Sequence, residues 1–413
     1  MSEQKKLLPK LRFPEFREAE GWEEKPLGEF MTESRMPGSK GNVAKKITVK
    51  LWGNGVFEKN DAIQGSINTQ YFRRKAGQFI YSKLDFLNQA FGIIPTSLDD
   101  FESTVDLPCF DFADGLNPVF LLEYVKRKDF YEKLGETADG SRKARRIHAE
   151  TFLSFPIALP SPVEQQKITD CLSSLDELIA AQARKVDALK THKKGLMQQL
   201  FPREGETQPR LRFPEFQNAD EWEETRLEKL GKLIAGLTYS PDDVRESGLL
   251  VLRSSNVQNG EIALDDCVYV DPSIKGANLS QPEDILICVR NGSKALIGKC
   301  ALIPQGMPLC THGAFMTVFR ADTPSFVFQL FQSDRYQKQV AGDLGATINS
   351  INGSQFLKYE FFVPKPAEQK RIADFLASLD TLITASTQEL ETLKTHKKGL
   401  MQQLFPSAEA VEA

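Results

Sequence analysis

Residues 189–202 read LKTHKKGLMQQLFP, and residues 393–406 read the same letters without a difference. Upstream, EQQKITDCLSSLDELI at residues 164–179 corresponds to EQKRIADFLASLDTLI at residues 368–383. A second repeated element opens each half, as LRFPEFREAEGWEEKPL at residues 11–27 and LRFPEFQNADEWEETRL at residues 211–227. The period of about 200 residues is far longer than a solenoid repeat. The chain is therefore a duplicated unit, in which a globular block precedes a long segment.

The two long segments have the pattern of coiled-coil helices. Apolar residues recur at alternating steps of four and three, a 3.5-residue repeat that is typical of a coiled-coil seam. The seam positions are Ile168, Leu172, Leu175, Ile179, Val186, Leu189, Leu196 and Leu200 in the first segment, and Ile372, Leu376, Leu379, Ile383, Leu390, Leu393, Leu400 and Leu404 in the second. Gln182, Lys193, Ser386 and Lys397 take the remaining seam positions. Prolines flank both segments and set the helix ends.

We expect the two helices to pair with each other in antiparallel orientation, because a whole globular block lies between the end of the first and the start of the second. Parallel pairing, which would crowd both blocks at one end, is the alternative. Antiparallel pairing would bring Gln182 close to Ser386, unless Gln182 points to solvent. It would also place the segment at Leu11 near Pro406, so that the chain forms a closed ring.

The globular blocks share a plan rather than residues. Residues 76–95 and 282–304 are predicted to be paired strands with a turn between them. Residues 120–134 and 326–340 are predicted to be helical, and each block closes on an apolar strand at residues 152–162 or 356–366. The predicted fold class is α+β, with two globular domains separated by two long antiparallel coiled-coil helices in a pseudo-two-fold circular arrangement. The predicted boundaries are 1–162, 163–202, 203–366, 367–406 and a tail at 407–413.

Composition restricts the class of protein. Its 413 residues are 41% hydrophobic and 26% charged, as in ordinary globular proteins. No run of 18 apolar residues predicts a membrane helix, and the N-terminus lacks the apolar region of a signal peptide. Six scattered cysteines indicate free thiols in a reducing cytoplasm rather than disulfides or a zinc site. A net charge of −4 argues against binding nucleic acid by bulk charge, so local basic clusters matter more.

The sequence lacks the motifs of the obvious enzymes. A DNA methyltransferase would need a glycine-rich loop for the methyl donor and an Asn/Asp-Pro-Pro-aromatic motif. The nearest match, Asn117 to Phe120, lacks the second proline and is better explained as the start of a helix. Asp242 and Asp243 have the look of a nuclease pair without the strand that should follow, which favours a solvated loop. We therefore expect no catalytic residue, no cofactor and no metal.

The order and spacing of these segments closely resemble the specificity subunits of type I restriction-modification enzymes, over nearly the whole chain. The resemblance implies that the globular blocks are target recognition domains that read a bipartite, asymmetric double-stranded DNA site. It implies that the helices are spacers on which two methyltransferase subunits dock, with restriction and translocase subunits joining the full complex. Independently, two identical helix ends suit two copies of one partner, and two different blocks suit two different half-sites.

Candidate DNA contacts follow from residue chemistry, since arginine suits guanine or phosphate and asparagine suits adenine. In the first block they are Arg142, Lys143, Arg145 and Arg146 in a loop before the final strand. In the second block they are Thr347, Asn349 and Asn352 in the matching neutral loop, with Ser254, Ser255, Asn256, Arg290 and Asn291 as weaker candidates. Lys50, Trp52 and Asn54 hold the place of residues 254–256 in the first block. Ordinary turn or core roles are the alternative for these weaker candidates.

Partner contacts are expected at Lys193, Lys194, Lys397 and Lys398, near the repeated helix ends. Two other functions are consistent with the pattern. The main alternative is a non-enzymatic coiled-coil scaffold that does not bind DNA, and the second is an enzyme with an unfamiliar site in the globular blocks. Binding of duplex DNA, with and without a methyltransferase partner, separates the three.

Overall fold

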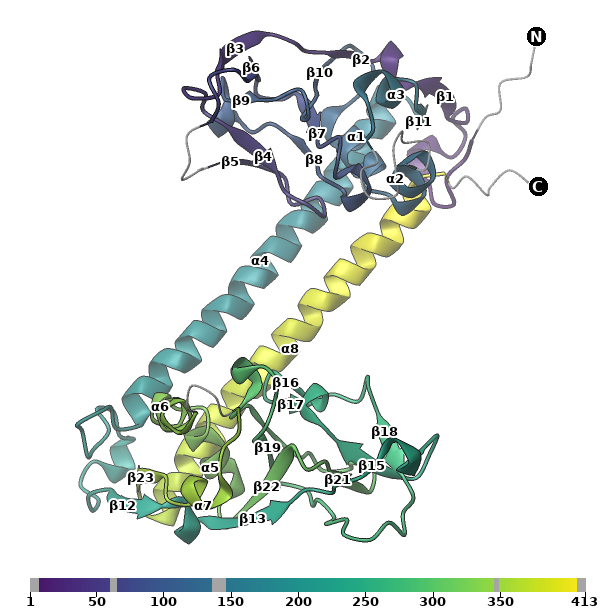
Figure 1. The fold of residues 1–413 in the computed structure, drawn as a ribbon. Coiled ribbons are helices and arrows are strands. Elements are labelled where there is room, and N and C mark those ends of the chain that lie inside the picture. Colours follow the sequence, from purple (N-terminus) through teal and green to yellow (C-terminus); the bar gives the residue numbers. More distant parts are fainter. Residues whose placement is uncertain (1–6, 60–64, 136–145, 345–348, 407–413) are drawn as a thin grey trace. The chain divides into compact units, whose positions relative to one another are not determined.

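The computed structural model describes residues 7–59, 65–135, 146–344 and 349–406. The chain divides into two compact units, Met1–Gln182 with Glu389–Ala413 and Ala183–Gln388. Two long helices, α4 (Pro162–Leu200) and α8 (Pro366–Leu404), each contribute one part to each unit (Figure 1). Both units combine short strands with helices, which confirms the predicted α+β class.

The first unit is built on a four-stranded sheet of order β2-β10-β7-β8. The strands of the whole unit are β1 (Glu23–Pro26), β2 (Met31–Glu33), β3 (Pro37–Lys40), β4 (Ile47–Val49), β5 (Val56–Glu58), β6 (Gln70–Arg73), β7 (Phe79–Tyr81), β8 (Phe91–Ile93), β9 (Glu102–Ser103), β10 (Cys109–Phe112) and β11 (Pro156–Leu159). Its short helices are α1 (Pro118–Val125), α2 (Lys128–Gly135) and α3 (Ala149–Leu153). All three residues of β7 are buried, as the unbroken apolar run in its sequence requires.

The second unit repeats this sheet in the same order, as β13-β22-β19-β20. Its strands are β12 (Glu223–Arg226), β13 (Gly231–Ala235), β14 (Val244–Arg245), β15 (Leu249–Leu252), β16 (Val257–Gln258), β17 (Glu261–Ile262), β18 (Val268–Val270), β19 (Ile285–Cys288), β20 (Cys300–Leu302), β21 (Cys310–His312), β22 (Met316–Ala321) and β23 (Glu360–Val363). Its short helices are α5 (Pro324–Leu330), α6 (Asp334–Asp343) and α7 (Gly353–Phe356). The predicted strand pairs are confirmed, because β7 pairs with β8 and β19 with β20 in antiparallel register.

Each core takes the start of one long helix and the end of the other. In the first unit, Ile168 and Leu172 of α4 pack in one cluster with Leu404 and Phe405 at the end of α8. In the second unit, the residues from the end of α4 are Met197 and Leu200, and those from the start of α8 are Ile372 and Leu376. The interpretation of Asn117 as the start of a helix is confirmed, since its side-chain oxygen accepts the amides of Val119 and Phe120 at the start of α1. Within the described residues, no helix has the length and apolar character needed to cross a membrane.

A pair between a half-buried arginine and a buried glutamate joins the LRFPEF segment to the first turn of the long helix in each unit. In the first unit, Arg12 donates Nε and Nη2 to the two carboxylate oxygens of Glu164, at 2.8 and 2.7 Å. In the second unit, Arg212 makes the same two bonds to Glu368, at 2.9 and 2.6 Å. Glu164 and Glu368 are only 1% and 2% exposed, so each carboxylate depends on its arginine for compensation.

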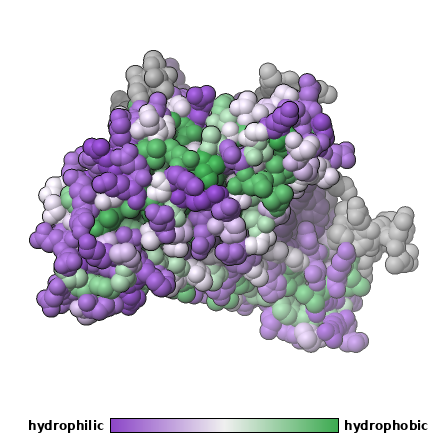
Figure 2. Space-filling view, turned by 90° about the horizontal axis from the view of Figure 1, so that it is seen from below, coloured by the Kyte–Doolittle hydropathy of each residue, from purple (hydrophilic) through white to green (hydrophobic). Residues whose placement is uncertain are grey.

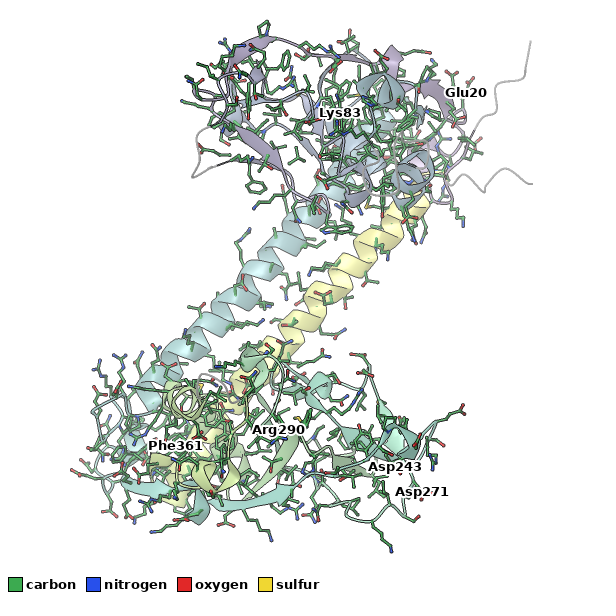
Figure 3. All side chains as sticks on the ribbon, viewed as in Figure 1. Glu20, Lys83, Asp243, Asp271, Arg290 and Phe361 are labelled. Atoms are coloured by element: carbon green, nitrogen blue, oxygen red, sulfur yellow. The ribbon has the colours of Figure 1, made fainter. Side chains whose placement is uncertain are left out.

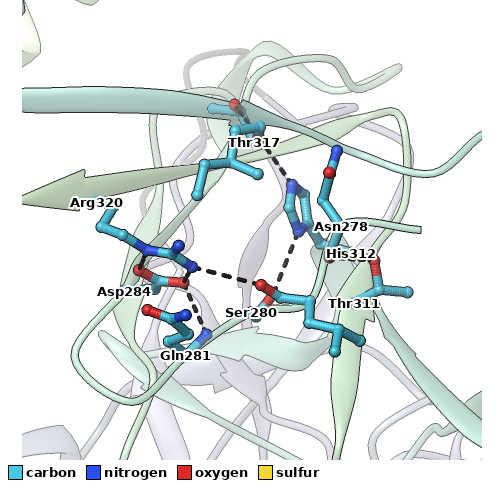
Figure 4. A network of polar contacts seen from close by, with 10 residues as sticks. Asn278, Ser280, Gln281, Asp284, Thr311, His312, Thr317 and Arg320 are labelled. Atoms are coloured by element: carbon cyan, nitrogen blue, oxygen red, sulfur yellow. Dashed lines mark hydrogen bonds and ion pairs between the residues drawn. The ribbon is translucent and has the colours of Figure 1, made fainter. Parts of the chain in front are cut away.

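A polar network ties β21 to the neighbouring strands of the second unit (Figure 4). The fully buried His312 bonds through Nε2 to the carbonyl oxygen of Ile234 at 3.0 Å and through Nδ1 to the hydroxyl of Ser280 at 3.3 Å. Nearby, Arg320 makes a bidentate pair with the buried Asp284, at 2.7 Å for each bond. The two His312 contacts suit a neutral ring that donates from Nε2 and accepts at Nδ1.

The arginine clamp generates a stability prediction. Arg12→Met leaves the Glu164 carboxylate buried without its cation, and should destabilise the first unit by about 3–5 kcal/mol. Arg12→Met combined with Glu164→Met removes the orphaned charge and should recover most of that loss. Urea unfolding followed by circular dichroism measures both. If the double variant were as unstable as the single one, the charge of Glu164 would not be the cause.

Burial lowers the pKa of His312 below its ordinary value, with the Ile234 carbonyl only partly offsetting this effect. In the unfolded chain the ring binds a proton near pH 6.5, whereas the folded state resists it. The second unit should therefore lose stability as the pH falls through 6.5 toward the lower folded-state pKa.

His312→Gln should remove this part of the pH dependence, and His192→Gln, at an exposed position, should not. Urea midpoints measured between pH 5 and 8 give the comparison. An unchanged slope in His312→Gln would assign the acid sensitivity to other groups.

Candidate nucleic-acid interface

Three segments far apart in the sequence converge in the second unit: residues 253–256 after β15, residues 289–293 after β19, and residues 349–352 before α7. We call them the second loop cluster. Asn291 donates its Nδ2 to the hydroxyl of Ser254 at 3.1 Å, and Asn349 donates its Nδ2 to the carbonyl of Gly292 at 3.2 Å. Arg290 and Ser350 form an isolated antiparallel bridge. The structure thus brings together Ser254, Arg290, Asn291 and Asn349, which the sequence analysis had predicted separately as candidate DNA contacts.

Arg290 is the exposed cation of this cluster (Figure 3). Its guanidinium lies over the ring of Phe315, 5.7 Å from the centroid, and Phe315 is itself 58% exposed. Backbone amides of Val289 and Arg290 both donate to the carbonyl of Phe315, at 3.0 and 3.1 Å, which fixes the hairpin. A planar guanidinium held over an exposed ring is poised for bidentate contact with a base edge or a phosphate.

The prediction for Asn256 is corrected by its burial. Asn256 is 0% exposed; its Oδ1 accepts the amide of Arg253 at 2.8 Å and its Nδ2 donates to the carbonyls of Ala263 and Asp266. Its amide is fully used in shaping the loop and is not available to a base. Ser255, in contrast, is exposed at the tip of the same turn.

The asparagines of residues 349–352 have different surroundings. Asn352 is exposed, and its Oδ1 caps α7 by accepting the amide of Ser354 at 2.9 Å. Its carbonyl oxygen is therefore engaged in a helix cap. Thr347 lies outside the described residues.

The first unit builds a matching cluster from residues 50–55 after β4, residues 82–90 between β7 and β8, and residues 146–148 before α3. We call these segments the first loop cluster. The amide of Trp52 donates to the carbonyl of Asn88 at 2.8 Å, and the amide of Ile147 donates to the carbonyl of Lys83 at 3.1 Å. The corresponding bond in the second unit joins Ile351 to Val289 at 2.8 Å. The same three connections therefore meet at the same place in both sheets.

Of the basic loop in the first block, only Arg146 is among the described residues; Arg142, Lys143 and Arg145 lie outside them. Arg146 is 47% exposed and lies 3.8 Å from the carboxylate of Asp106, which is 48% exposed. An exposed pair at this distance contributes little to stability, so Arg146 can exchange Asp106 for a phosphate at small cost.

The four lysines expected to contact a partner divide into two kinds. Lys193 is 7% exposed, and its Nζ bonds to Asp380 at 2.6 Å and Gln332 at 2.8 Å. Lys397 bonds to Asp176 at 2.7 Å and approaches the buried Glu123 at 3.0 Å. Burial alone would lower the pKa of Lys397, but the charge of Glu123 and the bond to Asp176 outweigh it and raise that pKa. The docking role predicted for Lys193 and Lys397 is corrected, because internal carboxylates hold both ammonium groups.

Lys194 and Lys398, the next residues, are exposed. Lys194 lines an open groove of about 880 Å³ in the second unit, between the end of α4 and helix α6, together with Gln198, Arg335 and Lys338. These two lysines remain candidates for a partner surface.

Most of the face displayed in Figure 2 is hydrophilic, with apolar residues gathered in a few areas.

Lys83 lies in the first loop cluster and Phe315 contacts Arg290 of the second, although neither was among the candidates predicted from the sequence (Lys83 is labelled in Figure 3). For Lys83 a signal existed, since residues 76–95 and 282–304 resemble each other and place it near Arg290. For Phe315 there was none, because an aromatic residue before a buried strand is expected to lie in the core.

Within the described residues, no group of three histidine, cysteine or acidic side chains could hold a metal ion. Asp243 accepts bonds from the amide and hydroxyl of Ser240, as expected of a loop cap.

Comparison with known proteins gives one family. Residues 219–395 match the family described as the type I restriction modification DNA specificity domain. The specificity subunit of the type I restriction enzyme StySPI from Salmonella potsdam is 29% identical over 197 residues, and that of EcoKI from Escherichia coli K12 is 30% identical over 186 residues. These alignments cover 45% and 43% of this chain but only 42% and 40% of the relatives, so the chain matches about two fifths of their length.

A longer alignment joins this chain to the MjaVIII specificity subunit from Methanocaldococcus jannaschii, 24% identical over 299 residues and covering 70% of each chain. Among solved structures, the S subunit of the type I restriction-modification system from M. genitalium has a TM-score of 0.59 at 13% identity, covering 97% of this chain and 100% of that one. A chain from a study of type I complex assembly has a TM-score of 0.57 at 15% identity, covering 94% and 98%. The fold is shared with these solved structures at low sequence identity, and the match to the DNA specificity domain family lies within residues 219–395.

Proposed function

We propose that this chain is the DNA-sequence-specificity subunit of a type I restriction-modification complex and that each loop cluster reads one half of a bipartite, asymmetric site. The observation that carries the proposal is that the same backbone connections in the two units present different side chains. The same three connections converge in both units, yet one cluster presents Trp52, Lys83 and Arg146 and the other presents Ser254, Arg290 and Asn349. Equal frames position the clusters, and unequal side chains select different bases.

The chemistry of the second cluster suits base edges. An exposed arginine pairs bidentately with guanine, and hydroxyl and amide groups beside it complete hydrogen bonds to neighbouring bases. Arg146 and Lys83 in the first cluster suit phosphates or guanine. This local cationic character is compatible with the overall acidity of the chain, because phosphate contacts depend on charge near the DNA.

We infer that two methyltransferase subunits dock on the repeated helix ends. Residues 189–202 and 393–406 are identical in sequence, and their exposed Lys194 and Lys398 occupy the same place in each copy. In the second unit the groove beside Lys194 provides a concave surface for such a partner. Restriction and translocase subunits would complete the complex in the cytoplasm, and this chain would carry no catalytic step itself.

We also infer that α4 and α8 form an antiparallel coiled coil that closes the chain into a pseudo-two-fold ring, with recognition domains at 1–162 and 203–366. Two reciprocal ion pairs support this arrangement: Lys193 with Asp380 in one unit and Lys397 with Asp176 in the other. The amide of Leu11 donates to the carbonyl of Gln403 at 2.9 Å, and Leu211 makes the matching bond to Gln199, also at 2.9 Å. The two seam residues near the midpoints, Gln182 and Ser386, are both buried, and Gln182 donates to Glu389 at 2.8 Å.

The function is tested by coexpressing the chain with a methyltransferase partner and mapping methylated adenines in the host DNA. A two-part motif with an unread gap is expected. Filter binding then uses a duplex that carries this motif, with either half scrambled as a control. The chain alone should transfer no methyl groups. Assembly with the methyltransferase but no sequence preference in DNA binding would favour the scaffold alternative.

Arg290→Ala should weaken binding of the motif duplex by roughly 5- to 150-fold, the range expected when a bidentate base contact is lost. Arg290→Lys should not restore it, because an ammonium cannot make the planar pair. Arg245→Ala, at an exposed position in the same unit, is the matched control and should stay within about twofold. Equal losses on duplexes with the second half intact or scrambled would show that Arg290 contacts phosphate and not a base.

Lys194→Glu combined with Lys398→Glu should reduce methyltransferase docking, measured by analytical ultracentrifugation of the mixed subunits. The folded chain should keep its thermal midpoint, because both side chains are exposed. The neighbouring substitution Lys397→Met should behave oppositely, lowering the thermal midpoint because the buried Glu123 keeps only one of its two cations, Lys126. Normal assembly of the well-folded double variant would place the partner elsewhere.

A further inference from the structure

Trp52 is a large aromatic side chain that the fold of the first unit leaves outside. It is 63% exposed, whereas the other two tryptophans of the chain, Trp22 and Trp222, are 0% and 3% exposed. Trp22 and Trp222 pack in the cores of their units, and this packing accounts for their size. Trp52 gains little from burial, so its size needs another explanation.

The backbone at Trp52 is strained. Its φ is +59°, a left-handed conformation that is unfavourable for a bulky residue, and Gly53 and Gly55 follow with φ of +67° and +88°. The loop is nevertheless fixed, because the amides of Trp52 and Gly53 donate to the carbonyls of Asn88 and Gln89 at 2.8 and 2.9 Å. Strain that the surroundings hold in place is typical of functional positions.

The neighbours of Trp52 suit DNA. Lys50 lies over the ring of Phe57, 4.0 Å from the centroid, and Phe57 is 43% exposed. Lys83 and Arg146 belong to the same loop cluster. The cluster therefore combines an exposed indole with cations, the combination by which proteins stack on bases while neutralising nearby phosphates.

The internal repeat indicates whether the Trp52 loop binds DNA or a protein partner. A surface for two copies of one methyltransferase must be the same in both halves of the chain, as residues 189–202 and 393–406 are. Residues 50–55 have no such copy, since the corresponding loop of the second unit carries Ser254 and Ser255. The Trp52 loop therefore serves something that differs between the halves, and the two half-sites of the DNA are what differs.

We propose that Trp52 determines the specificity of the first half-site by stacking its indole on a base there. The proposal rests on the DNA-specificity function proposed above and adds an apolar contact to it. The second cluster, built on Ser254, Arg290 and Asn349, reads its half-site through hydrogen bonds. The two halves of the site are thereby read by different chemistry.

Because Trp52 is the single exposed tryptophan, intrinsic fluorescence reports on it selectively. Iodide should quench part of the emission of the wild-type chain and almost none of that of Trp52→Phe. Adding the duplex that carries the methylated motif should reduce the iodide quenching of the wild type to the level of Trp52→Phe. Protection by the methyltransferase subunit without DNA, or no protection by DNA, would overturn the proposal.

Binding measurements provide the second arm, on the same duplex. Trp52→Ala should weaken binding by roughly 5- to 100-fold, the effect of losing one stacked base, whereas Trp52→Phe should retain most of the affinity. The loss should disappear when the first half-site is scrambled and persist when the second is scrambled. Val43→Ala, which also removes an exposed apolar side chain of the first unit, should leave binding within about twofold.

A structural role is excluded by stability. Trp52→Gly relieves the left-handed strain and should leave the thermal midpoint unchanged or higher. A marked fall in the midpoint would mean that the indole serves folding, and would overturn the proposal. If wild-type and variant chains both bind the motif duplex equally, the inference about Trp52 fails while the DNA-specificity function stands. If the wild-type complex binds no duplex specifically, it is the proposed function that fails.

Discussion

The architecture depends on one interaction that the chain makes twice, the pairing of an arginine with a buried glutamate at the first turn of a long helix. Arg12 and Glu164 form it in the first unit, and Arg212 and Glu368 form it in the second. Each arginine also donates to two carbonyl groups in the turn that follows its own segment. A single side chain thus fixes the opening segment, the turn before the buried tryptophan, and the start of the helix. Removing either partner would leave a desolvated charge, which makes the junction specific as well as stable.

The clamp belongs to the parts of the chain that recur in both units, whereas the globular blocks differ. The helix ends, the clamps and the buried lysines recur in both units with nearly the same contacts. A difference enters beside each buried lysine, where α1 supplies Glu123 and α5 supplies Gln329, which donates to Asp380 at 3.2 Å. The identical helix end therefore packs on two different blocks by using a carboxylate in one and an amide in the other. A second side chain of the block takes part in the second unit, where Gln332 accepts a bond from Lys193 at 2.8 Å.

How much of this could be predicted from the sequence depended on the range of the interactions involved. The duplication, the two long helices, the hairpin strands and the α+β class were predictable, because periodicity and local propensity determine them. The failures concern polar residues whose partners come from distant segments. Lys193 and Lys397 looked like surface charges, but they are neutralised by Asp380 and Asp176, which lie 187 and 221 positions away in sequence. Asn256 was predicted to contact a base because asparagine suits adenine. Its burial depends on the carbonyls that the folded loop offers to its amide, and local sequence does not reveal these.

The loop clusters show why different side chains can occupy equal frames. Their positions are fixed mainly by backbone bonds, such as Trp52 to Asn88 and Ile147 to Lys83 in the first unit and Ile351 to Val289 in the second. A bond between backbone groups does not depend on the side chain, so the residue at each tip can change without moving the loop. Two bonds in the second cluster depart from this rule, since Asn291 and Asn349 use their side-chain amides to tie the segments together. Each of these amides spends one donor on the protein, which leaves the exposed guanidinium of Arg290 as the freer group for recognition. The backbone therefore sets the frame, and on the proposed function the selectivity would come from the side chains that the frame leaves unbound.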